Sequence, residues 1–105
     1  MTNHKVKIVV NCRNFDETTG KFIVLEMKEV RVSSLTEFKT YPGIYFLVAK
    51  TSDGLFGMYE FSTGAMLVRD MVNKKVALEQ GTNKLFKHTV VDLQKALSKW
   101  EVINK

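Results

Sequence analysis

Lys74 and Lys75 occupy the first turn of a predicted helix, directly after Asn73, a residue type that caps helix N-termini. Cations are unfavourable there, because the positive end of the helix dipole costs each of them about 0.3–1 kcal/mol. The free backbone amides of the same turn are anion donors, so a bound phosphate would satisfy both the lysines and the amides. The alternative is that two exposed lysines tolerate this small cost and bind nothing. Anion binding is therefore the chemistry that these residue types indicate, with simple solvation as the alternative.

The remaining reactive side chains form no recognisable catalytic or metal-binding set. The two histidines, His4 and His88, have no sequence neighbour at metal-ligand spacing. The single cysteine, Cys12, falls on the apolar positions of an alternating segment, where we expect a small buried hydrophobic residue. No glycine pattern resembles a phosphate-binding loop. We therefore expect a protein that is not an enzyme and that uses no metal and no cofactor.

The composition is that of an ordinary globular domain with a surplus of basic residues. The chain has 105 residues, of which 45% are hydrophobic and 26% charged, and we expect one domain over residues 1–105. Sixteen Lys and Arg against eleven Asp and Glu give a net charge of +5, which favours anionic partners. No stretch approaches the run of about 20 apolar residues that spans a bilayer. One cysteine favours a reducing compartment, so we expect a cytoplasmic location and no membrane partner.

Alternation and turn residues predict strands in the N-terminal half of the chain. Residues 5–12 alternate as a half-buried strand. A second strand begins near Lys21, and its apolar residues change parity near Lys28-Glu29, where we expect a bulge. Residues 34–38 have the spacing of a capping box and predict one helical turn.

Residues 44–70 read as a three-stranded antiparallel meander. Its first strand is apolar at both parities, which is typical of a central strand covered on both faces. Turns are predicted at Ser52-Asp53-Gly54 and at Ser62-Thr63-Gly64. In the second strand, the residues of odd number (55–61) and the residues of even number point to opposite faces. If the odd set packs under the helices, Phe56 and Met58 are exposed.

Two helices are predicted after the meander. Asn73 caps the first, in which Gly81 costs roughly 1 kcal/mol against alanine and marks either a weak point or the end of the helix. Thr89 opens the second, whose apolar stripe recurs at helical spacing as far as Trp100. The predicted fold is α+β, an antiparallel sheet of about five strands with two C-terminal helices packed on one face.

One order of elements runs through residues 43–80, namely strand, hairpin, strand, turn, strand and helix. Thr63-Gly64 forms the second turn, Lys74-Lys75 opens the helix and Ala77 lies further along it. This pattern resembles the arm-type DNA-binding domain of tyrosine recombinases, which is related to the AP2 fold. The resemblance implies that the sheet face enters the major groove of DNA, and that the residues facing DNA include Lys50, Arg69 and Tyr59.

Two functions remain open at this point. The first is a small non-catalytic protein that binds DNA or RNA through the basic residues at the sheet edge and the helix start (Lys50, Arg69, Lys74 and Lys75). Backbone contacts should dominate, because only three arginines, the usual readers of guanine, are present. The second is a protein–protein interaction module, either a homodimer or an inhibitor of the type encoded by phages and mobile elements. It would use a sheet edge or an apolar strip of Phe56 and Met58.

Overall fold

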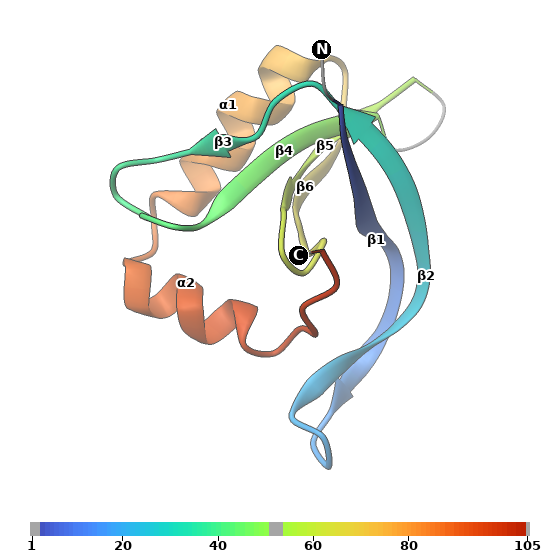
Figure 1. Cartoon of the computed structure of the whole chain (residues 1–105). Helices are drawn as coiled ribbons and strands as arrows, with labels where there is room; N and C mark the ends of the chain where they lie inside the picture. Colours follow the sequence, from blue (N-terminus) through green and yellow to red (C-terminus); the bar gives the residue numbers. More distant parts are fainter. Residues whose placement is uncertain (1–2, 51–53, 105) are drawn as a thin grey trace.

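The computed structural model describes residues 3–50 and 54–104 and shows an α+β fold (Figure 1). The described strands are β1 (His4–Asp16), β2 (Lys21–Val32), β3 (Thr36–Glu37), β4 (Tyr45–Lys50), β5 (Phe56–Glu60) and β6 (Met66–Met71). The helices are α1 (Lys74–Leu85) and α2 (Val90–Leu97). The predicted meander and both helices are confirmed. Ser52 and Asp53 of the predicted hairpin turn lie outside the described residues.

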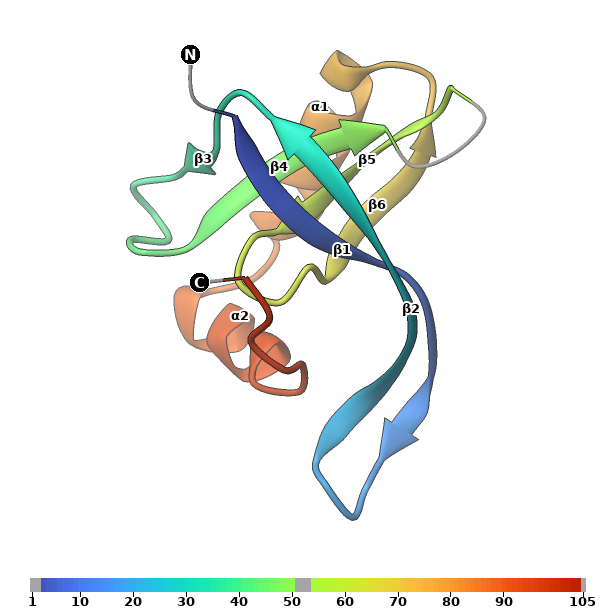
Figure 2. The ribbon, with the colours of Figure 1, turned by 45° about the vertical axis from the view of Figure 1, so that its right-hand side comes forward.

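The strands form two sheets rather than one. β1 and β2 pair as a long hairpin, and the other four strands form an antiparallel sheet in the order β3-β4-β5-β6. The hairpin crosses one face of the four-stranded sheet and α1 lies behind the other face (Figure 2). The sheet face that the DNA-binding resemblance would leave open is therefore covered, because the two N-terminal strands fold over that face instead of extending the sheet.

Each face of the four-stranded sheet therefore has its own hydrophobic core. The core under the hairpin contains Val6, Ile8, Leu47, Ala49 and Tyr59. The core under the helices contains Tyr41, Phe46, Met58, Leu85 and Leu93. Both cores draw on β4, which confirms the prediction that this strand is covered on both faces. Burial of apolar side chains at about 25 cal/mol per Å² makes these two layers the main source of stability.

The hairpin is irregular, and its irregularity lies near the predicted position. Pairing is regular from His4 opposite Val32 as far as Val9 opposite Met27, and the register then shifts at Asn11. The first irregularity thus lies one or two residues from the predicted Lys28-Glu29, with the extra residue in β1, and two further register shifts follow between Asn11 and Phe15. Past the bulge the hairpin projects beyond the sheet (Figure 2). Cys12 is consequently exposed, so the prediction that it is buried was wrong.

The chain after α2 supports the projecting half of the hairpin. The Trp100 ring stacks on Phe22 with a centroid distance of 4.5 Å, and the Phe22 amide donates to the Lys99 carbonyl at 2.8 Å. Further along, the Asn104 side chain accepts from the Lys7 amide at 2.9 Å and donates to the Phe61 carbonyl at 2.7 Å. The C-terminal segment therefore ties the hairpin to the turn between β5 and β6.

The turn between β5 and β6 is built around a buried carboxylate. Glu60 is 3% exposed and accepts hydrogen bonds from the amides of Ser62 and Thr63 at 2.7 and 2.9 Å. The carbonyl of Gly64 in this turn accepts from the amide of Val9 at 2.9 Å. The predicted turn is confirmed, and it is also the place where β1 docks on the meander.

The segment before β4 is extended rather than helical. Thr36 pairs with Phe46 and Glu37 with Tyr45, and the Glu37 carboxylate accepts from the Gly43 amide at 2.7 Å instead of capping a helix. The predicted helical turn was therefore wrong. Because β3 has only two residues, it covers only the first part of β4.

Gly81 lies inside α1, which continues through it, and a side chain there would collide with the core. A Cβ at this position would contact Met58 Sδ and lie 2.9 Å from Met58 Cβ. Helix propensity alone would make Gly81→Ala stabilising by about 1 kcal/mol. Overpacking costs about 1–3 kcal/mol, so we expect a net loss of about 1 kcal/mol in the free energy of unfolding.

Chemical denaturation of Gly81→Ala measures this change. The exposed neighbour Gln80 on the same helix provides the control, since Gln80→Ala should change stability by only a few tenths of a kcal/mol. A higher midpoint for Gly81→Ala than for the unmodified protein would contradict the packing argument.

Candidate functional site

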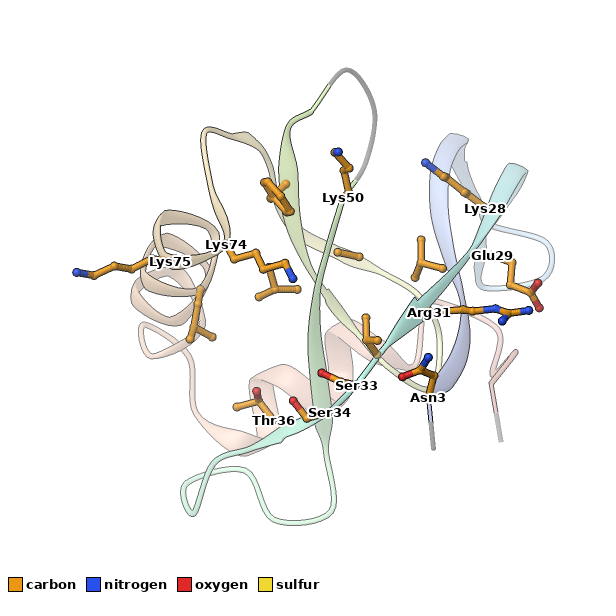
Figure 3. Close-up of a pocket in the computed structure, with 16 residues that line it drawn as sticks. Asn3, Lys28, Glu29, Arg31, Ser33, Ser34, Thr36, Lys50, Lys74 and Lys75 are labelled. Carbon is orange, nitrogen blue, oxygen red and sulfur yellow. The ribbon is translucent and has the colours of Figure 1, made fainter. Parts of the chain in front are cut away.

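A groove of about 1060 Å³ opens beside the last residues of β4 (Figure 3). Its lining comes from the end of β2, the segment 33–36, the end of β4, Phe56 of β5 and the first turns of α1. The groove exists because β3 pairs only with Tyr45 and Phe46. In the described part of the chain, residues 47–50 of β4 therefore have a strand partner on one side only, β5.

The groove collects basic side chains from three elements. These are Lys28 and Arg31 of β2, Lys50 of β4, and Lys74 and Lys75 of α1, and we call the hollow they line the basic groove. Figure 3 shows the Lys74 ammonium directed into the groove, whereas Lys75 points away from it. Arg31 and Glu29, the carboxylate of this lining, both point to the far side of β2.

Among the described residues, no carboxylate forms an ion pair with the groove lysines of the meander and the helix. All of the basic side chains that line the groove are exposed. Within the described residues the ion pair found is that of Arg69 and Asp70, so no described carboxylate lies within ion-pair distance of Lys50, Lys74 or Lys75. The arrangement therefore presents a concentrated positive potential on one side of the molecule.

Local sequence explains why Lys74 and Lys75 lie at the surface at the start of α1. Asn73 caps α1, and its side-chain oxygen accepts from the Val76 amide at 2.9 Å, as predicted. The first turn of α1 contains no acidic residue, so the helix dipole is not compensated there. The inner positions of the helix are Ala77, Gly81 and Leu85, which leaves the preceding lysines at the surface.

Apolar side chains lie between the cations in the same groove. They are Val30, Val32, Val48, Ala49, Phe56 and Leu78. Phe56 is half-buried, and it belongs to neither hydrophobic core. The basic groove is therefore amphipathic, with ammonium groups and an aromatic ring side by side.

Arg69 is not part of the basic groove. It borders a second hollow of about 440 Å³, together with Tyr59 and Asp70, on the side of the sheet that the hairpin covers. Its Nε lies 3.5 Å from Asp70 Oδ2, and Asp70 has a positive φ of 61° where the β5–β6 register shifts. The structure thus brings together Lys50, Lys74 and Lys75 of the predicted set and separates Arg69 from them.

Tyr59 cannot face DNA in the way that the resemblance implied. Its side chain is 1% exposed and lies in the core beneath the hairpin. Burial raises the pKa of its hydroxyl to about 12, against the opposing effect of Arg69 and with a smaller contribution from Asp70. The sheet face of the meander that carries Tyr59 is consequently covered by the hairpin, and the basic groove lies at the sheet edge instead.

The predicted apolar strip of Phe56 and Met58 does not form. Met58 is fully buried beneath the helices, and only Phe56 of the pair reaches a surface hollow. The reason is the direction in which the side chains of β5 point. Met58 points toward the helices and Tyr59 toward the hairpin, which is the reverse of the arrangement that would expose Met58.

Sequence reasoning missed Lys28 and Arg31. Lys28 shares its parity with Val30 and Val32, which are half-buried, so it lies on the inner face of β2. A cation at such a position was the available signal, because it indicates a polar hollow rather than apolar core beside that part of the strand. It borders both hollows, because β2 passes between them where it crosses the sheet. That crossing cannot be read from local periodicity.

Comparison with known proteins assigns no relative, since no family model, no curated protein and no solved structure matches this chain. The described residues contain no group of three or more His, Cys, Asp or Glu side chains placed to hold a metal ion. Neither described helix is long and apolar enough to cross a membrane.

Proposed function

We propose that this protein is a small non-catalytic binding protein that holds nucleic acid in the basic groove. The observation that supports it is the convergence of Lys28, Lys50 and Lys74 from three elements distant in sequence. A phosphate backbone offers closely spaced negative charges, and lysines that contact it release condensed counterions. The cytoplasmic location expected from the single cysteine would give such a protein access to both RNA and DNA.

The binding should depend mostly on the backbone and only modestly on sequence. Arginine is the side chain that most often reads guanine. Arg31 points away from the groove, and Arg69 is paired with Asp70 in the second hollow. Lysines that contact phosphates position a nucleic acid without selecting its bases.

A second candidate rests on the open edge of β4. An unpaired strand edge can accept an extended peptide segment by adding a strand to the sheet. The surrounding lysines would favour an acidic segment, for example in a host protein that is inhibited by this one. We favour nucleic acid because the cations come from both sides of the edge.

Fluorescence anisotropy with labelled mixed-sequence duplex DNA and single-stranded RNA tests the proposal. For Lys50→Gln/Lys74→Gln we expect weaker binding and a slope of log K against log salt that is shallower by about 1.4–1.8, because two phosphate contacts are lost. The control is Lys87→Gln/Lys95→Gln, which removes the same charge from exposed lysines outside the groove and should keep the slope.

Two results would refute the proposal. One is the absence of binding to either nucleic acid at low salt. The other is an equal loss in both double variants, which would show that net charge matters and the groove does not. The first result would also direct attention to acidic peptides as ligands of the β4 edge.

A further inference from the structure

The basic groove combines features that duplex DNA cannot use together. We propose that its ligand is a single strand of nucleic acid, one base of which stacks on Phe56; this inference rests on the proposed function and specifies its substrate. In a duplex the bases are stacked inside and the outer surface is sugar and phosphate. A single strand offers both phosphates and free base faces, which matches a groove lined by cations and apolar groups.

Two aromatic side chains of the meander, Tyr45 and Phe56, belong to neither core, and of these two Phe56 lines the groove. Phe46 and Tyr59 are fully buried, one in each core, whereas Phe56 is half-buried and lines the groove. No other described ring lies against it. A partly exposed ring beside lysines is the arrangement on which single-strand binders stack bases.

The register of the sheet places a cation next to this ring. Lys50 is the cross-strand partner of Phe56, and directly opposed residues of an antiparallel pair have Cβ atoms about 4.5–5.5 Å apart. A base stacked on Phe56 would therefore have its phosphate within reach of Lys50. The Lys74 ammonium, directed into the same groove, is placed to contact a neighbouring phosphate (Figure 3).

The open edge of β4 adds hydrogen-bonding groups suited to unpaired bases. Backbone amides and carbonyls on an unpaired edge require partners. The Watson–Crick edges of a duplex are already paired, whereas those of a single strand are free to donate and accept. Val48 and Ala49 bring this edge into the lining of the groove.

The test compares a labelled single-stranded DNA of mixed sequence with the duplex of the same sequence, using the full chain at one low salt concentration. We expect the single strand to bind at least tenfold more tightly. Phe56→Leu should weaken single-strand binding about tenfold, since it removes the stacking face and keeps an apolar side chain, and should leave duplex binding unchanged. Phe56→Tyr, which keeps the ring, should bind like the unmodified protein.

The outcomes separate this inference from the proposed function. Equal affinity for strand and duplex, or no effect of Phe56→Leu in a variant with an unchanged circular dichroism spectrum, would overturn the single-strand inference and leave nucleic-acid binding in place. No binding of either DNA by the unmodified protein would overturn both. Loss of binding in Phe56→Tyr as well as in Phe56→Leu would show that the ring does not act as a stacking face.

Discussion

Charge reversal at the start of α1, in the variant Lys74→Glu/Lys75→Glu, should weaken nucleic-acid binding by more than about tenfold while it stabilises the fold. An ammonium and a phosphate 4 Å apart attract by about 1 kcal/mol in water, and reversal replaces attraction with similar repulsion. Reversal at Lys74, whose ammonium points into the groove, therefore costs about 2 kcal/mol at low salt, or roughly thirtyfold in Kd, and reversal at Lys75, which points away, adds less. Folding responds in the opposite sense, because carboxylates are favourable at a helix N-terminus where cations are not.

The stability gain should be about 1 kcal/mol, which raises the melting temperature by about 4–8 °C. The first turn of α1 has no acidic residue at present, so no existing carboxylate would be crowded by the new ones. The two lysines therefore lower the free energy of unfolding relative to glutamates at the same positions. The proposed binding of an anion would account for that cost.

The single variants should differ. The Lys74 ammonium points into the basic groove and that of Lys75 points away, so Lys74→Glu should account for most of the lost affinity (Figure 3). Lys87→Glu/Lys95→Glu changes the net charge equally outside the groove and should weaken binding much less. Anisotropy titrations together with thermal melts measure both quantities, and equal losses in the two double variants would contradict the assignment of the groove.

Replacing Gly64 with alanine should cause the largest loss of stability among the substitutions considered. Gly64 has a φ of 73°, in the left-handed region that costs an alanine about 1–2 kcal/mol. An added Cβ would also contact the Lys7 carbonyl and lie 3.1 Å from Ile8 Cα. These are backbone atoms of β1 and cannot move as a side chain can, so overpacking adds about 1–3 kcal/mol.

We expect a total loss of about 3 kcal/mol for Gly64→Ala, enough to lower the melting temperature by more than about 10 °C. Gly20 provides a matched control, because its φ of 72° is nearly the same and nothing lies within 4 Å of an added Cβ. Gly20→Ala should therefore show the backbone cost alone. Equal losses for the two variants in denaturant titrations would show that the close approach to β1 contributes nothing.

The sequence determined the elements whose signals are local. Asn73 and Thr89 act as N-caps because their side-chain oxygens reach amides three residues on, within one turn of the helix. Residues 44–70 formed the predicted meander because turn chemistry and alternation repeat at short range. Local signals gave a wrong prediction where pairing with a distant strand determines the secondary structure. The capping-box spacing from Ser34 to Glu37 became a short strand, because pairing with β4 offered the backbone better partners than one helical turn.

Only the tertiary structure decided which surfaces are available. Alternation in β5 requires Met58 and Tyr59 to point to opposite faces of the sheet. Both sets of alternating residues are apolar, so the alternation does not determine which of the two faces the helices. The position of the β1–β2 hairpin over the sheet, rather than beside it, closed the face that carries Tyr59 and brought Lys28 next to the groove. The same placement left part of the β4 edge open. The placement of the hairpin and the facing of β5 depend on contacts between residues far apart in the chain, which local periodicity does not encode. The same contacts bring lysines that are distant in sequence together in the basic groove.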